Sequence, residues 1–151
     1  MNANSFADSA TGKSMANAEI TNGADIVFQA AGATGLGVIE ACQEAGVYAI
    51  GVDSDQSSIA PNTVLTSAMK RVDNAVYEAV QELIDGTLEG GVKSFDLAAG
   101  GVDIAPSQDL IAPEVISAVD EVKEKIVNGE IEVPDDKESF EAKYGDVYQL
   151  D

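Results

Sequence analysis

Apolar and polar positions in the first half of the chain follow two alternating patterns. Short apolar runs are typical of buried strands, and apolar residues that recur every three or four positions are typical of helices that pack on one side. Asp8 is predicted to cap the first helix, and Gly23 and Gly46 are predicted to end the first two helices. The predicted elements are a helix ending at residues 22–23, a strand over 25–31, a helix over 34–45, a strand over 47–52 and a strand over 63–66.

The clearest helical pattern runs from Ala68 to Asp85 and is followed by Gly86, which is expected to end the helix. Its predicted inner face consists of Met69, Val72, Val76, Val80 and Leu83. A further strand is expected over residues 92–97. Pro113 suits the first position of a last long helix, which Gly129 ends. The inner face of that helix is predicted to carry Ile116, Val119, Val122 and Ile126.

Buried strands that alternate with one-sided helices indicate a parallel sheet with helices on both faces. The predicted fold class is therefore α/β, with a doubly wound, Rossmann- or flavodoxin-like parallel sheet. A chain of 151 residues suits one domain of this kind. Ligands of such sheets bind outside the carboxyl ends of the strands, so candidate residues are expected in the loops that follow the strands.

The charge and the residue types that are missing exclude several classes of function. Eight Lys and Arg residues stand against 27 Asp and Glu residues, and the net charge of −19 makes nucleic acid and anionic membrane surfaces poor partners. The chain has no histidine and one cysteine, Cys42, which is predicted to lie in the core. Catalysis by Ser-His-Asp or Cys-His groups, zinc fingers and an internal disulfide are therefore excluded. No metal site and no cofactor is predicted.

Neither a membrane span nor a signal peptide is predicted. No apolar run approaches the roughly 18 residues that a spanning helix needs. Residues 1–8 lack the basic and apolar regions of a secretory signal, so the chain is expected to carry no signal peptide.

The segment Gly32–Gly37 is rich in glycine and joins a predicted strand to a predicted helix. Backbone N–H groups and the helix dipole attract negative or polar ligand atoms at such junctions. Its pattern, G-x-x-G-x-G, is the reverse of the dinucleotide fingerprint, and Asp53 follows at a distance suited to holding ribose hydroxyls. Three interpretations stay open: a tight turn that lets helix and strand pack closely, a ribose-binding site, and a dinucleotide site.

A second motif, Ala7–Ser14, matches a phosphate-binding loop except for alanine at its first glycine position. Such a loop follows a buried strand, and the few residues before this motif do not form one. Lys13 is therefore expected on the solvated face of a helix, with an NTPase site as the alternative.

Phe6 and Lys70 each allow a structural and a ligand-binding interpretation. Phe6 either packs on the first helix as a hydrophobic staple or offers a face on which a base or sugar stacks. Lys70 is predicted at the start of the long helix, where the dipole disfavours a cation. It therefore either serves a ligand or forms a surface pair with Asp73 or Asn74.

Several segments together resemble the C-terminal half of the basic membrane protein family, also described as purine nucleoside receptor A-like. The resemblance extends from about residue 4 to residue 134. It rests on the segments SFAD (5–8), GADIVFQAAG (23–32), GLGVIEA (35–41), GVYAIGVDSDQ (46–56), VLTS (64–67), GGV (100–102) and GEIEVP (129–134).

Members of this family are substrate-binding proteins of ABC transporters for purine nucleosides. The resemblance implies a lobe of a type I periplasmic binding protein that is not an enzyme and binds a nucleoside of the guanosine, inosine and adenosine class. It also implies a transporter permease as partner, and a parent protein that is periplasmic or a membrane-anchored lipoprotein. The alternative is a nucleotide-binding enzyme domain of the NAD or ATP type.

The family's ligand-binding residues match four positions of this sequence. By this resemblance Phe6 stacks on the purine, Gly32 lies beside the ligand at a strand end, and Asp53 grips the ribose hydroxyls. Lys70 matches a lysine near the ligand. Asp53 is preferred to Asp55 as the residue that holds the ribose.

The family's chains contain a first lobe as well, which is expected to be missing from this chain. Residues 1–134 are therefore expected to form the second ligand-binding lobe, and residues 135–151 an acidic C-terminal tail. Missing strands would leave an exposed sheet edge, through which a homodimer is expected to form.

Overall fold

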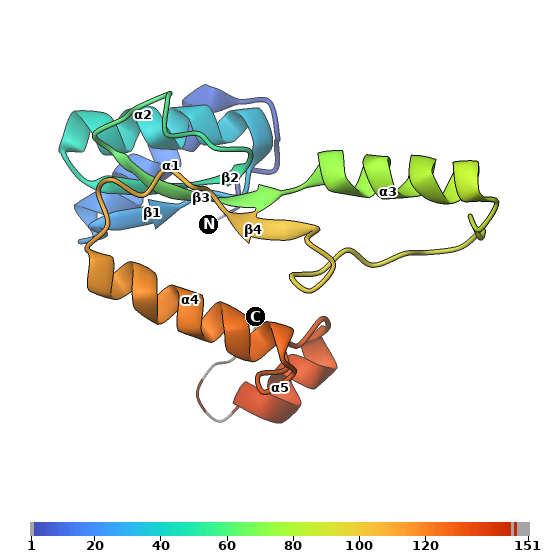
Figure 1. The fold of residues 1–151 in the computed structure, drawn as a ribbon. Helices are drawn as coiled ribbons and strands as arrows, with labels where there is room; N and C mark the ends of the chain where they lie inside the picture. Colours follow the sequence, from blue (N-terminus) through green and yellow to red (C-terminus); the bar gives the residue numbers. More distant parts are fainter. Residues whose placement is uncertain (1, 146, 148–151) are drawn as a thin grey trace. The chain divides into compact units, whose positions relative to one another are not determined.

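The computed structural model describes residues 2–145 and 147, which divide between two compact units, Met1–Ile116 and Ser117–Asp151 (Figure 1). Its helices are α1 (Ser9–Thr21), the single 3-10 turn η1 (Gly32–Thr34), α2 (Gly35–Ala45), α3 (Val72–Asp85), α4 (Pro113–Val127) and α5 (Lys137–Tyr144). Its strands are β1 (Ile26–Phe28), β2 (Tyr48–Asp53), β3 (Val64–Lys70) and β4 (Val102–Ile104). Within the described residues, no helix has the length and hydropathy that crossing a membrane requires.

The four strands form one sheet in the order β1-β2-β3-β4. The first three strands are parallel, and β4 pairs with β3 in the antiparallel direction. The mostly parallel sheet with its helices confirms the α/β fold class. Its parallel part also places the carboxyl ends of β1, β2 and β3 at one edge of the sheet.

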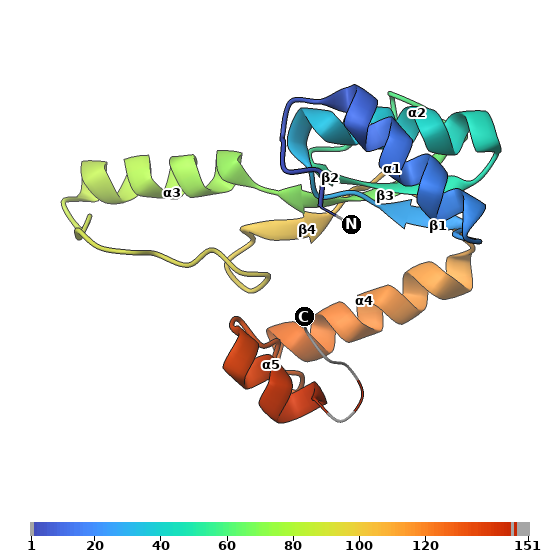
Figure 2. The ribbon, with the colours of Figure 1, turned by 180° about the vertical axis from the view of Figure 1, so that it is seen from behind.

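Helices α1 and α2 pack side by side on one face of the sheet (Figures 1 and 2). As predicted, Asp8 caps α1 by accepting a hydrogen bond from the Thr11 backbone N–H at 3.0 Å. Gly46 ends α2 in the left-handed conformation at φ 71°. A Cβ atom on Gly37 would overlap the backbone carbonyl of Ser9, so this glycine is what allows the two helices to approach.

The hydrophobic core lies between these helices and the sheet. It consists of Ala16, Val27, Val38, Ile39, Ala41, Cys42, Ala49, Ala60 and Val64. Cys42 is fully buried, as predicted, and burial raises the pKa of its thiol. On the other side of β1 and β2 the side chains of Ile26, Phe28 and Tyr48 are exposed. Strand β1 is therefore buried on one side only, and not on both as its apolar run predicts.

The boundary between β3 and α3 differs from the prediction. Ala68, Met69 and Lys70 belong to β3, because they pair with Ile104, Asp103 and Val102 of β4. The helix therefore begins at Val72. The strand predicted over residues 92–97 is wrong: this segment is a loop, and the strand that follows α3 is β4.

No residue of α3 is buried, although the helix forms where its pattern predicts. The predicted inner face is exposed at Val72, Val76, Val80 and Leu83. In both ribbon views α3 continues beyond the end of β3 and lies against neither face of the sheet (Figures 1 and 2). Helix α4 likewise has no buried residue. Periodicity thus predicts the helix and its apolar face correctly, but the predicted burial of that face is wrong.

The second unit contains most of α4 and the short helix α5. Asp136 caps α5 through a capping box with Ser139. The rings of Phe140 and Tyr144 lie 5.5 Å apart between centroids. Part of the predicted acidic tail, residues 146 and 148–151, falls outside the described residues.

Ile39 offers a direct test of the core. Its side chain is completely buried between α2 and the sheet, so Ile39→Ala is expected to destabilise the fold by about 2–5 kcal/mol. The matched control is Ile84→Ala on α3, where the side chain is 72% exposed and the expected change is within about 0.5 kcal/mol. Urea unfolding followed by circular dichroism measures both. Equal effects of the two substitutions would contradict this placement of the core.

Candidate functional site

Three of the four candidate residues lie at the common edge formed by the carboxyl ends of β1, β2 and β3. Gly32 follows β1, Asp53 is the last residue of β2, and Lys70 is the last residue of β3. Phe6 reaches the same edge from the segment before α1, because the Thr34 backbone N–H donates to the Phe6 carbonyl at 3.3 Å. The structure thus brings the candidates together in two pairs, Asp53 with Lys70 and Phe6 with Gly32.

Asp53 and Lys70 form an ion pair. Asp53 Oδ1 lies 2.9 Å from Lys70 Nζ, and the two side chains are 50% and 71% exposed. The pair forms because Asp53 stands opposite Met69 in the β2–β3 register, which puts Lys70 one residue further along. An exposed pair contributes only about 0–1 kcal/mol to stability. Both side chains are therefore placed where a ligand could reach them.

The prediction for Lys70 is wrong in two respects, its secondary structure and its partner. Lys70 ends a strand and does not begin a helix, so the dipole argument does not apply to it. Its ion-pair partner is Asp53, whereas Asp73 and Asn74 accept hydrogen bonds from Arg71 at 2.8 and 3.2 Å.

Asp53 has an unusual backbone. Its φ is 69°, in the left-handed region that residues other than glycine seldom occupy. The Ser54 backbone N–H donates to the Val52 carbonyl at 2.8 Å, which closes a three-residue turn centred on Asp53. Strain of this kind persists only where the surroundings hold it, and it is concentrated at functional sites.

Phe6 and Gly32 lie against each other. Gly32 has a φ of 55°, and a Cβ atom built on it would lie 3.4 Å from the Cβ of Phe6. Phe6 is 76% exposed, which does not fit a hydrophobic staple because a staple would bury the ring. The ring therefore presents an open aromatic face beside the end of β1.

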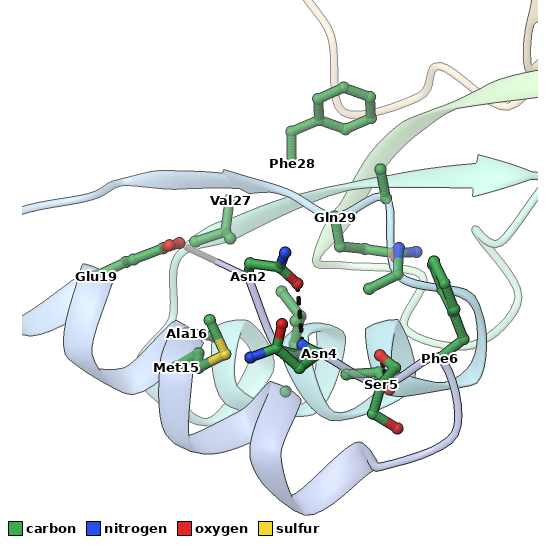
Figure 3. A pocket seen from close by; sticks show the side chains of 16 residues that line it. Asn2, Asn4, Ser5, Phe6, Met15, Ala16, Glu19, Val27, Phe28 and Gln29 are labelled. Carbon is green, nitrogen blue, oxygen red and sulfur yellow. Dashed lines mark hydrogen bonds between the residues drawn. The ribbon is translucent and has the colours of Figure 1, made fainter. Parts of the chain in front are cut away.

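A cavity of about 750 Å³ lies beside β1, the outer strand of the sheet, and extends under the segment before α1. Figure 3 shows Val27 and Phe28 on opposite sides of the strand, with Gln29 and Phe6 near one end of the cavity. The lining includes Phe6 but not Gly32, Asp53 or Lys70. The cavity thus borders the strand-end site and does not contain it.

The other glycines of the Gly32–Gly37 segment have packing roles. A Cβ atom on Gly35 would overlap the side-chain amide of Gln29, and one on Gly37 would overlap the Ser9 carbonyl. The first of the three open interpretations, close packing at a tight turn, is therefore correct for these positions. The glycines alone give no reason to invoke a dinucleotide.

The motif Ala7–Ser14 does not form a phosphate-binding loop. Its residues from Ser9 onward already form α1, and among the described residues no strand comes before the motif. The Lys13 ammonium donates to Glu44 at 2.8 Å and to Glu40 at 2.9 Å, and the pKa of Lys13 is raised chiefly by the hydrogen bond to Glu44. Lys13 thus joins α1 to α2 at the surface.

Asp55 is engaged within the protein. Its Oδ2 accepts a hydrogen bond from Ser107 Oγ at 2.6 Å, and its Oδ1 accepts one from the Ser57 backbone N–H at 3.0 Å. The Ser107 hydrogen bond, followed by that of Ser57, lowers the pKa of the Asp55 carboxyl group. These contacts favour Asp53 over Asp55 as the carboxylate that is free to meet a ligand. Among the described residues no cluster of three or more acidic or cysteine side chains could hold a metal ion.

A buried polar group lies beneath the strand ends and has no assigned role in the sequence-based prediction. It consists of Gln29 and Ser67, which are 3% and 0% exposed, together with the half-buried Gln56. A signal was available in the sequence: Gln29 interrupts an otherwise apolar run, and Gln56 ends the segment that begins at Asp53.

The chain matches a known family over most of its length. Residues 1–137 match the family described as ABC transporter substrate-binding protein PnrA-like. Basic membrane protein D of Borreliella burgdorferi (strain JD1) is 39% identical over 142 residues, which cover 90% of this chain and 42% of that protein. The CD4+ T-cell-stimulating antigen of Listeria monocytogenes is 35% identical over 150 residues, which cover 88% of this chain and 42% of that protein.

The fold is also similar to solved structures. A solute-binding protein of an ABC transporter system from Aeropyrum pernix K1 superposes with a TM-score of 0.76 at 26% identity, covering 91% of this chain and 48% of that one. The chain therefore spans less than half the length of these relatives.

The Asp55–Ser107 hydrogen bond predicts a pH dependence. Ser107→Ala is expected to raise the pKa of Asp55 toward its ordinary value, because the main contact that favours the charged form is lost. Since the pKa is lower in the folded chain, the stabilisation is present above the pKa of an unfolded aspartate and is lost as the pH falls through the folded value. Stability should therefore fall less steeply in acid for Ser107→Ala than for the wild type.

An NMR titration of the Asp55 carboxyl carbon measures this pKa, and urea unfolding at neutral and acid pH measures the stability. Ser58→Ala, in the same loop as Asp55, is the control and should leave the Asp55 titration unchanged. The same Asp55 pKa in the wild type and in Ser107→Ala would contradict the assignment.

Proposed function

The chain belongs to the PnrA-like family of ABC transporter substrate-binding proteins, and from this premise we propose that it binds a purine nucleoside at the carboxyl ends of β1, β2 and β3. The ligand would be of the guanosine, inosine and adenosine class. The chain would hold and deliver it to a transporter permease without transforming it. The parent protein would act outside the cytoplasm, either in the periplasm or as a membrane-anchored lipoprotein.

One observation carries this proposal: an open aromatic face and an exposed carboxylate lie at the same edge of the sheet. A purine is flat and stacks on an aromatic ring, which contributes about 1–3 kcal/mol. The two hydroxyls of ribose are donors that suit a carboxylate, and such a hydrogen bond contributes about 1.5–3 kcal/mol. Phe6 and Asp53 supply these two groups, and Lys70 adds a donor for ring or sugar oxygens.

We further propose that residues 1–134 form the second of two lobes, with residues 135–151 as an acidic tail. Two features support this. The chain spans about 42% of the length of the relatives quoted above, and α3 carries an apolar stripe that nothing in its own unit buries among the described residues. A first lobe would supply a surface for that stripe and a second wall for the ligand. One wall alone predicts weak binding.

Calorimetric titration with guanosine and inosine tests the proposed ligand class, with NAD and Mg-ATP as comparison ligands. We expect heat from the nucleosides only. Asp53→Asn should weaken nucleoside binding about tenfold, because a hydrogen bond to a neutral group contributes about 1–1.5 kcal/mol less than one to a charged group. Asparagine tolerates the left-handed backbone, so this variant removes the charge and keeps the turn.

Asp25→Asn is the matched control, because Asp25 is an exposed aspartate immediately before β1, at the opposite edge of the sheet. Heat from NAD or Mg-ATP in place of the nucleosides would favour the enzyme-domain alternative. No heat from any of the four would contradict nucleoside binding by this lobe alone.

We also propose that two copies of the chain pair through the outer edge of β1. Strand β1 pairs only with β2 among the described strands, and its register turns the peptide groups of Ile26 and Phe28 away from β2. Phe28 is 59% exposed beside this edge. An apolar strand with one unpaired side is a template for another strand.

Light scattering should therefore give about twice the monomer mass of 15.6 kDa. Phe28→Lys should shift the chain to the monomer, because a charge on an edge strand opposes pairing. The matched variant Leu83→Lys alters an apolar residue of α3 that is 65% exposed, close to the value of Phe28, and should leave the dimer intact. A monomeric wild type, or dissociation by Leu83→Lys alone, would contradict pairing through β1.

A further inference from the structure

Gln56 connects three strands of the sheet through its side chain and its backbone N–H. Its Oε1 accepts hydrogen bonds from Gln29 Nε2 at 2.9 Å and from the Val52 backbone N–H at 3.0 Å. Its own backbone N–H donates to Ser67 Oγ at 3.1 Å. Gln29 follows β1, Val52 lies in β2 and Ser67 in β3, so one residue joins all three strands beneath the site.

Gln56 replaces a missing part of β1. The Gln29 backbone N–H still donates to the Ile50 carbonyl, but β1 then leaves the sheet. If β1 continued, its next carbonyl would accept from the Val52 N–H, since Phe28 stands opposite Ile50. The Gln56 side-chain oxygen takes that role, so the backbone N–H of Val52, the residue before Asp53, keeps a hydrogen-bond acceptor.

Two hydrogen bonds of the Val52 backbone hold the residue that precedes the turn at Asp53. The Val52 N–H is bound by Gln56, and the Val52 carbonyl accepts from the Ser54 N–H at 2.8 Å. Between these two bonds Asp53 takes its left-handed φ of 69°. A strained residue keeps such a conformation only when its neighbours are held, and Gln56 is the side chain that holds Val52.

Two glycines, Gly51 and Gly35, leave room for the side chains of this polar group. A Cβ atom on Gly51 would stand 2.5 Å from Gln56 Oε1 and 2.6 Å from Ser67 Oγ. One on Gly35 would overlap the Gln29 amide. Among the described residues every buried side-chain nitrogen or oxygen has a hydrogen-bond partner, and a polar group paired in this way favours one arrangement of its members.

We propose that Gln56 is a positioning residue for ligand binding: it holds the turn that directs the Asp53 carboxylate to the ligand, and touches no ligand itself. This inference rests on the proposed function, because it assigns a cause to the affinity of the same site. It also makes a claim about the Asp53 backbone that is measurable without any ligand.

The test compares three variants. Gln56→Met keeps the length of the side chain and removes its acceptor, Gln56→Glu keeps the acceptor, and Gln81→Met is a control at an exposed glutamine of α3. In Gln56→Met, hydrogen exchange of the Val52 amide should accelerate at least about tenfold, because its buried acceptor is gone. The NMR shifts of Asp53 should move away from their left-handed values. Gln56→Glu and Gln81→Met should resemble the wild type in both measurements.

Guanosine affinity is the second readout. Gln56→Met should weaken binding about tenfold, whereas in an Asp53→Asn background the same change should cost less than about twofold, because its effect passes through Asp53. Unchanged Val52 exchange in Gln56→Met would overturn the inference. So would equal losses of affinity with and without the Asp53 carboxylate. If the wild type binds no guanosine, the proposed function fails for this chain, and the exchange and shift measurements alone decide whether Gln56 holds the turn.

Discussion

The pairing register between β2 and β3 is the constraint on which the candidate site depends. Ala49 stands opposite Val64, but Ile50 stands opposite Thr66, so one extra residue enters β3 between these positions. Because of this irregularity Asp53 faces Met69, and Lys70 is its next neighbour. Without it Asp53 would face Ala68, and Lys70 would lie two residues beyond that partner instead of one. The irregular step in the sheet thus brings Lys70 one residue closer to Asp53.

The candidate site has two parts: a largely buried polar group of Gln29, Gln56 and Ser67, and an exposed ion pair of Asp53 and Lys70 that a ligand can reach. The buried Gln29 side chain and Ser67 hydroxyl form hydrogen bonds with the half-buried Gln56, at a depth where an unpaired polar group would be costly. Asp53 and Lys70 pair in contact with water, where their attraction contributes little to stability. A ligand that displaces Lys70 from Asp53 would therefore lose little, while the buried group keeps the backbone in place. The preorganised polar group and the weak Asp53–Lys70 ion pair both favour ligand binding, because each keeps the free-energy cost of rearranging the site small.

Local chemistry explains which elements could be predicted from the sequence. The ends of α1 and α2 are set by Asp8 and Gly46, whose roles depend only on their immediate neighbours. The boundary at residues 68–71 could not be predicted, because Met69 continues the helical spacing of Val72 and Val76. Its strand conformation comes from pairing with Asp103 of β4, which is 34 residues further along the chain (103 − 69). The choice of Asp53 as a candidate followed from its place after an apolar run. Its left-handed turn could not be predicted in this way, because the neighbouring bond from the Val52 N–H to Gln56 depends on how the loop after β2 folds back.

Helix α3 shows what a periodic pattern of apolar residues predicts and what it does not. Such a pattern predicts a helix and identifies its apolar face, and both are present from Val72 to Leu83. The pattern does not specify which surface covers that face, and among the described residues no side chain of α3 is buried. An apolar stripe that stays exposed to water favours association with another surface. The uncovered apolar face of α3 therefore supports, independently of the family match, the proposal that this strand-end site is one wall of a larger binding unit.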